Sequence, residues 1–106
     1  VAGPYSAPTE AQRQQNLDAM NAAAAALFQM GHIPFIGVNM ALPVVAQYTA
    51  GNAYDAIMTI SMAVIDQCDA LFHIVESTGA NRERDHIAAK GVPVYTSLSE
   101  VPPAIL

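Results

Sequence analysis

The sequence predicts a small α/β domain with about four parallel strands and four helices. Two observations lead to this prediction. Segments with the residue content of helices alternate along the chain with short apolar runs, which is typical of parallel βαβ units. Several of the helical segments also begin at capping residues or end at glycine. A chain of 106 residues has room for one domain, which we expect to span residues 1–106.

The first part of the chain is predicted to hold an incomplete strand, a long helix and a second strand. Residues 1–4 have the pattern of a strand end that runs into a loop, so we expect the first strand to be truncated at its N-terminus. A capping box opens the helix-forming residues 10–30, and Gly31 follows them. The apolar run at residues 33–38 contains a proline, which predicts an edge strand.

The remaining elements alternate in the same way. Residues 39–52 lack a clear period and are predicted to form a loop or a short helix. Residues 53–67 have a helical pattern and are apolar on more than one face, which predicts burial on several sides. The most strand-like run, residues 70–75, leads through a glycine-containing turn into a helix that ends near Gly91. A strand at residues 92–95 and a short capped helix complete the predicted order.

Composition limits the partners of this chain. The net charge is −5 with only four Lys and Arg residues, so we expect no binding to a nucleic acid polymer or to a membrane surface. The apolar stretches fall short of the ~20 residues that a membrane span needs. With 53% hydrophobic and 12% charged residues, the chain is predicted to form a homodimer or homotetramer. The helix that carries Met58 and Met62 is the predicted interface.

The cysteine and histidine content points away from metal chemistry. Cys68 is the only cysteine, which predicts a reducing cytoplasm and no intrachain disulfide. The three histidines do not have zinc-ligand spacing, so we expect no metal and no cofactor. We interpret His73, inside an apolar strand, as a core or interface histidine. For His86, a solvated helix face is favoured over a role as an acid for a leaving base.

Four segments, in this order along the chain, carry a resemblance to a known family. They are Ala2-Gly3-Pro4-Tyr5, Cys68-Asp69-Ala70-Leu71, Ser77-Thr78-Gly79-Ala80-Asn81-Arg82-Glu83 and Gly91-Val92-Pro93-Val94. Together they resemble the nucleoside 2-deoxyribosyltransferase-like superfamily, and most of all a branch of short bacterial and phage proteins that carry only a domain-of-unknown-function label. The resemblance implies a three-layer Rossmann-like or flavodoxin-like fold, with the site at the carboxyl ends of the strands.

The resemblance also implies hydrolase or transferase chemistry at the N-glycosidic bond of a nucleoside or nucleoside monophosphate. Glu83 stands at the place of the family nucleophile, which attacks the anomeric carbon. A nearby carboxylate stabilises the oxocarbenium-like transition state of such a reaction. We expect Glu83 to lie in the first turn of a helix, whose dipole favours the carboxylate form. Tyr5 is the second candidate catalytic residue, because its ring could stack on a base or its hydroxyl could bond the carboxylate.

Six further residues are predicted to bind the substrate. They are Gly3, Pro4, Asn39, Ser77, Gly79 and Ala80. The first two shape the exit of the first strand, and the last three line a helix N-terminus whose amides could hold a phosphate or sugar oxygen. Asn39, at the end of the predicted second strand, could read a base edge. Each position also has a purely structural interpretation, as a helix cap, a packed loop or a turn.

One position departs from the pattern of the superfamily. Where well-studied members carry an aspartate that holds the sugar hydroxyls, this chain has Ser61. The difference favours, as an alternative to an enzyme, a non-catalytic nucleotide-binding or sensing module. A structural or assembly protein is the second alternative, since one scaffold hosts many activities. The sequence leaves open the base, the choice between ribose and deoxyribose, the need for a 5′-phosphate, and whether water or a second base accepts the sugar.

Overall fold

The computed structural model describes residues 1–104, and within them helices dominate. The four α-helices are α1 (Glu10–Gln29), α2 (Gly37–Val45), α3 (Ala53–Ile65) and α4 (Thr78–Ala89). The strands β1 (Leu71–Phe72) and β2 (Val94–Tyr95) follow α3 and α4, and a 3-10 helix, η1 (Leu98–Glu100), comes after β2. No helix among these residues is both long enough and apolar enough to span a membrane.

The predicted four-stranded, three-layer Rossmann-like or flavodoxin-like fold is wrong. The sheet has two parallel strands, with Leu71 opposite Val94 and Phe72 opposite Tyr95. Of the predicted first strand, only Ala2 contributes, through an isolated parallel bridge to His73. Its amide donates to the Phe72 carbonyl over 2.7 Å. The fold is therefore a mainly helical domain around a very short parallel sheet.

The predicted strand at residues 33–38 is also wrong. Residues 33–36 join no ladder, and the helix α2 begins at Gly37. A short apolar run fits a strand and a buried helix equally well, so the tertiary contacts decide between them. Here α2 packs closely against α3 to form a helical hairpin. The predicted loop or short helix at residues 39–52 is thus the rest of α2 and the turn that follows it.

The other helices lie where the sequence predicts them, because their ends have clear capping signals. The side chains of Thr9, Asn52 and Ser77 accept hydrogen bonds from backbone amides at the N-termini of α1, α3 and α4. Gly31 and Gly91 have positive φ and lie just beyond the ends of α1 and α4. The prediction for residues 53–67 is confirmed within two residues, and α3 buries one side against α2 and another against α4.

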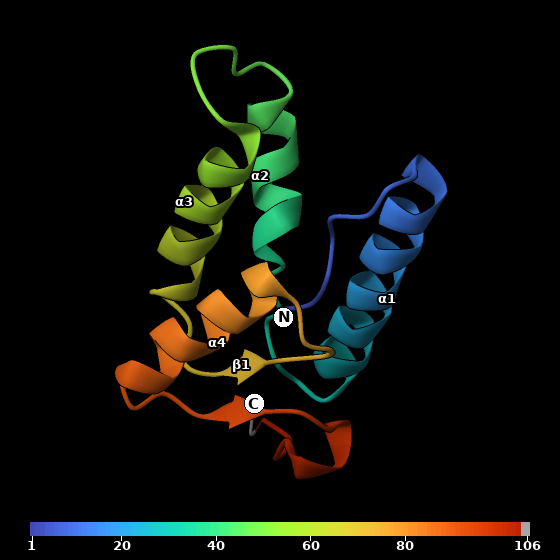
Figure 1. Cartoon of the computed structure of the whole chain (residues 1–106). Helices are drawn as coiled ribbons and strands as arrows, with labels where there is room; N and C mark the ends of the chain where they lie inside the picture. The colour runs from blue at the N-terminus through green and yellow to red at the C-terminus, as the bar shows by residue number, and fades with distance from the viewer. Residues whose placement is uncertain (105–106) are drawn as a thin grey trace.

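Two groups of buried side chains connect these elements. One joins the strands to α3 and α4 and consists of Ala2, Ile65, Leu71, Ala80 and Ile87. The other joins α1 to α2 and consists of Met20, Ile36 and Val38. In Figure 1 the α2–α3 hairpin extends away from the strands, α1 lies on the far side of α2, and the N-terminal segment runs between them. That segment and the start of α4 meet below the hairpin, where the candidate site lies.

Candidate functional site

A cavity of about 280 Å³ lies where the N-terminal segment, α3 and the start of α4 meet. Seven of the eight residues predicted for catalysis or binding line it. They are Gly3, Pro4, Tyr5, Ser77, Gly79, Ala80 and Glu83. The short parallel pairing of Ala2 with His73 is sufficient to bring the end of the first segment beside the turn after β1. The structure therefore gathers the predicted site although the predicted sheet is incomplete.

Glu83 is the only carboxylate among the residues that line this cavity. Its side chain is half-buried in the cavity wall, and this desolvation raises the pKa of Glu83 to about 7, from an ordinary value of 4.5. A carboxyl group with a pKa near 7 exchanges its proton at neutral pH, which suits a catalytic acid, base or nucleophile.

The prediction that the helix dipole keeps Glu83 ionised is wrong in two respects. Helix α4 begins at Thr78 after the cap Ser77, so Glu83 is in the second turn and not in the first. The influence of the dipole falls off within the first turn. Burial, which favours the neutral acid, therefore decides the direction of the pKa shift.

The N-terminus of α4 forms one wall of the cavity. The Ser77 hydroxyl oxygen accepts a hydrogen bond from the Ala80 amide over 3.1 Å, as an N-cap does, and its own O–H is left to donate elsewhere. A Cβ at Gly79 would lie 3.4 Å from Met58 Sδ and 3.9 Å from the Tyr54 hydroxyl. At position 79 the cavity wall therefore consists of backbone and not of a side chain.

The N-terminal segment forms the opposite wall. The side-chain amide of Asn16 on α1 donates to the backbone carbonyl of Tyr5 over 3.1 Å, which holds the backbone of the N-terminal segment beside the cavity. The Tyr5 ring is half-buried and packs at the edge of the cluster around Met20. Gly3 lies against the same methionine, since a Cβ there would be 3.2 Å from Met20 Cγ.

Asn39 is not among the residues that line this cavity, so the structure does not bring it together with the other candidates, and its role at a base edge stays a prediction. It lies in the first turn of α2, where its side-chain amide donates to Asn21 Oδ1 of α1 over 2.8 Å. The difference in position follows from the strand prediction for residues 33–38. A helix in place of the strand turns this side chain toward α1 and places the neighbouring Val38 in the cavity wall.

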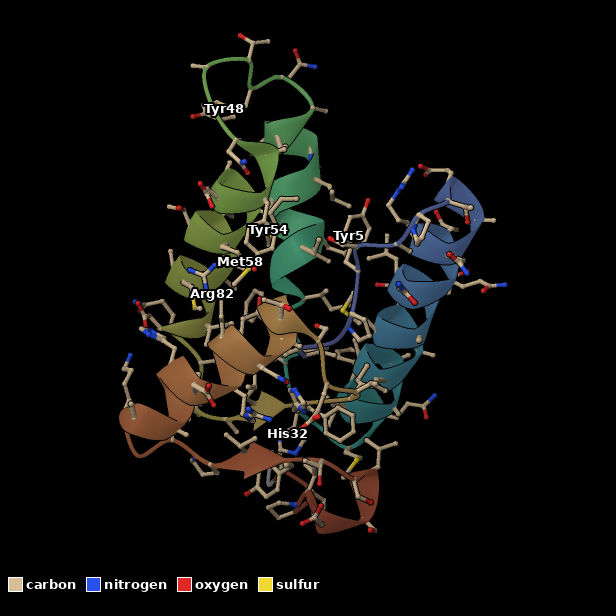
Figure 2. All side chains as sticks on the ribbon, in the orientation of Figure 1. Tyr5, His32, Tyr48, Tyr54, Met58 and Arg82 are labelled. Carbon is tan, nitrogen blue, oxygen red and sulfur yellow. The ribbon has the colours of Figure 1, made fainter. Side chains whose placement is uncertain are left out.

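Several wall residues come from α3 and were not predicted as a site. Tyr54, Ile57, Met58 and Ser61 all line the cavity. The Arg82 guanidinium lies over the Tyr54 ring, 5.8 Å from its centroid, and donates to the Tyr54 hydroxyl over 3.4 Å. Figure 2 shows Tyr54, Met58 and Arg82 in the region between α3 and α4. The helical spacing of the α3 residues was visible in the sequence. Which side of α3 faces Glu83 depends on long-range packing.

Ser61 is the deepest polar residue of the wall. It is 1% exposed, and its hydroxyl has no hydrogen-bond partner among the described residues. Its neighbour across the helical hairpin is Gly37, where a Cβ would lie only 2.7 Å from the Ser61 side chain. The small side chain at position 61 thus allows α2 and α3 to approach closely.

The helix face predicted as a subunit interface is partly enclosed within the chain. Met58 is buried and contributes to the cavity wall, so it is not available to a partner. Met62 is half-buried.

The histidines lie outside the cavity. The interpretation of His73 as a core residue is confirmed, since it is 4% exposed and its Nε2 lies 3.1 Å from Asn81 Oδ1. His86, in the last turn of α4, is hydrogen-bonded to Asp66 at the end of α3. Together with Lys90 it lowers the pKa of Asp66. Among residues 1–104, no group of three His, Cys, Asp or Glu side chains could hold a metal ion.

A second cavity, of about 530 Å³, lies at the opposite end of the strands. Its polar side chains include Cys68 and His32. Partial burial raises the pKa of the Cys68 thiol, which disfavours the reactive thiolate. The His32 ring is bonded to the Pro102 carbonyl. Although this cavity is larger, we assign the site to the smaller one, because that one contains the carboxyl group with a pKa near neutrality.

Comparison with known proteins places this chain in a family. The sequence profile of a family described as "Domain of unknown function (DUF4406)" matches residues 1–96. The chain belongs to the DUF4406 family. No curated protein and no solved structure matches it. The family description assigns no activity, so the resemblance of this DUF4406 chain to nucleoside 2-deoxyribosyltransferases stays a prediction.

Substitution of Gly79 by alanine tests the position of the cavity wall. We expect the variant to be as stable as the wild type or up to ~1 kcal/mol more stable, because alanine favours the helix and the nearest atoms lie at ordinary contact distance. We expect its affinity for a cavity ligand to fall by about tenfold, as for one extra methyl group in a fitted pocket. Urea unfolding and ligand titration measure the two effects. An unchanged affinity would place the ligand elsewhere.

Proposed function

We propose that this DUF4406 chain hydrolyses or transfers the N-glycosidic bond of a nucleoside or nucleoside monophosphate, with Glu83 acting at the anomeric carbon. The observation that carries the proposal is the Glu83 carboxyl group in a cavity of about 280 Å³, where burial raises its pKa to about 7. This volume lies near the lower limit for small-molecule sites, roughly 300 Å³, and suits a small ligand. The resemblance described above supplies the reaction class.

In the proposed reaction, a Glu83 carboxylate oxygen forms a bond to the anomeric carbon while the bond from that carbon to the base nitrogen breaks. The base leaves with the bonding electron pair and takes up a proton. Water then attacks the anomeric carbon, which releases the sugar and restores the carboxylate; in a transfer reaction a second base takes the place of water. Tyr5, in the opposite wall, is proposed to stack on the base or to donate to the carboxylate.

Two features support an oxygen-rich or phosphorylated substrate. The first turn of α4 presents the Ser77 hydroxyl and backbone amides to the cavity, and helix N-termini favour anions. Arg82 is not itself a lining residue, but its guanidinium lies over Tyr54, which lines the cavity, and so places a cation next to the wall. A cytoplasmic location is part of the same proposal, since such substrates are found there and Cys68 is the only cysteine.

The test is a panel of ribo- and deoxyribonucleosides and their monophosphates. A ligand at ~100 times its dissociation constant stabilises the native state by about 2.7 kcal/mol, which raises the unfolding midpoint by roughly 10–20 °C in a domain of this size. Chromatography of the same mixtures detects free base. Stabilisation together with base release supports the proposal. A panel with neither effect would contradict it and leave a structural or assembly role.

A non-catalytic nucleotide-binding or sensing module is the second candidate. The observation that favours it is Ser61, a buried hydroxyl in the cavity wall where the superfamily resemblance leads us to expect a carboxylate. A neutral side chain at this position adds no negative charge near the anomeric carbon. Binding of a member of the panel without any release of base is the result expected for this candidate.

The pH dependence of base release follows from the raised pKa of Glu83. As a nucleophile, Glu83 must be ionised, so we expect kcat/KM to rise with pH, to reach half its maximum near pH 7 and to level off above about pH 8. Below pH 6 the rate is expected to fall by about tenfold per pH unit. Initial rates measured from pH 5 to 9 check this. A rate that decreases as the pH rises through 7 would assign Glu83 the role of an acid.

A further inference from the structure

The α2–α3 hairpin has one apolar face that no other part of the described chain covers. We call it the hairpin face, and it consists of Met40 and Val44 of α2 with Ala56, Ile60 and Ala63 of α3. Met40 and Val44 are one turn apart and are 52% and 56% exposed. On α3, the half-buried Ile60 lies one turn from each alanine. The spacing of three or four residues places each set on one side of its helix.

The other sides of both helices are already used. Gly37 and Ser61 meet where α2 packs on α3. Val38 belongs to the buried cluster between α1 and α2, and Met58 lines the candidate site. The hairpin face therefore lies on the sides of α2 and α3 that these contacts leave free, and the hairpin that carries it projects from the strands in Figure 1.

The distribution of charge indicates what covers this face. Residues 33–54, which include all of α2, contain none of the 13 charged side chains of the sequence. Two of the nine large hydrophobic side chains that are exposed within residues 1–104, Met40 and Val44, lie in this stretch and belong to the hairpin face. The rest of the surface carries a net charge of −5, so two copies repel each other there. At the hairpin face, they can approach without bringing like charges together.

We propose that a second copy of this chain covers the hairpin face. In a two-fold symmetric contact, the same patch meets itself, which requires a surface that is complementary to its own copy. An uncharged apolar face meets this requirement, and the small Ala56 and Ala63 on either side of Ile60 allow the helices to approach closely. The two hairpins then form a four-helix contact that buries Met40 and Val44. This inference does not depend on the proposed reaction.

The experiment measures the molar mass in solution by light scattering and sedimentation for the wild type and three variants. M40E and M40K each place a charge at the contact, where two copies bring like charges together. The matched control is F28E, at an apolar position on α1 outside the face that is 63% exposed, against 52% for Met40. We expect the wild type and F28E to have twice the 11.2 kDa mass of one chain. Each Met40 variant alone is expected to dissociate at least tenfold more readily.

Mixing the two Met40 variants distinguishes a lost interface from a lost fold. Opposite charges then face each other, so we expect the equimolar mixture to recover the double mass, whereas two unfolded variants would not. Three results would overturn the proposal. They are a wild type that is monomeric at every concentration, an assembly whose mass is unchanged in M40E, and equal dissociation of F28E and M40E.

Discussion

Replacement of Glu83 by glutamine is expected to lower the rate of base release by ~10³-fold or more while nucleoside binding is retained. Glutamine keeps the size of the side chain but cannot attack the anomeric carbon or take up a proton, and loss of such a group typically costs several orders of magnitude. Chromatography measures the rate, and the ligand-induced rise of the unfolding midpoint measures binding. The matched control is Glu76→Gln, which removes one exposed carboxylate, paired with Arg84 over 3.4 Å, outside the cavity wall.

The same variant is expected to be more stable than the wild type at pH 8. The pKa of Glu83 is higher in the folded chain than in the unfolded chain, so the folded state binds more protons between about pH 4.5 and pH 7. Stability of the wild type therefore falls as the pH rises through this window, by an amount on the order of 2 kcal/mol. Glutamine does not ionise and avoids this loss. A variant that is inactive because it fails to fold would show the opposite change in urea unfolding, and a fully active one would remove Glu83 from the mechanism.

Substitution of Gly37 by alanine is expected to give the largest loss of stability among the glycine variants. The added Cβ would lie 2.7 Å from Ser61 Cβ and Oγ and 2.8 Å from the backbone Cα of the same residue. Because part of the obstacle is backbone, the helices must move apart, at a cost of about 1–3 kcal/mol. We expect the unfolding midpoint to fall by roughly 4–8 °C for each kcal/mol.

The control for Gly37→Ala is Gly79→Ala, the same chemical change in another helix. The Cβ of the control meets only side-chain atoms of Met58 and Tyr54 at ordinary contact distance, so we expect Gly37→Ala to lose stability and Gly79→Ala to lose none. Equal stabilities of the two variants would show that α2 and α3 do not approach closely at Gly37. That result would also remove the basis for the hairpin face.

The helices were predictable from the sequence because their signals are local. Thr9, Asn52 and Ser77 cap the N-termini of three of them, and Gly31 and Gly91 follow the ends of two. The strand predicted at residues 33–38 failed because a short apolar run does not determine its own structure. In the structure the helix α2 begins at Gly37, within this segment, and Gly37 packs against Ser61, which is 24 positions away in the sequence.

The candidate site was predicted in part for a similar reason. Glu83, Tyr5 and Gly79 lie together because a strand that leads into a helix places its turn beside the neighbouring strand end, even when only Ala2 and His73 pair. The wall from α3 was missed, since a helix that is apolar on several faces does not reveal which side meets the cavity. The direction of the Glu83 pKa shift was missed because it depends on burial, which follows from the assembled walls.

The proposed function depends on the cavity, which partly removes water from the Glu83 carboxyl group and thereby moves its pKa to neutrality. An NMR titration that follows the side-chain carboxyl carbons of selectively labelled glutamate, with Glu83→Gln to assign the signal, measures this directly. Because desolvation raises the pKa of this group, we expect a midpoint near pH 7 for Glu83. A midpoint at the ordinary value of about 4.5 would contradict it, because the carboxyl group would then be hydrated and the cavity would not form the site described.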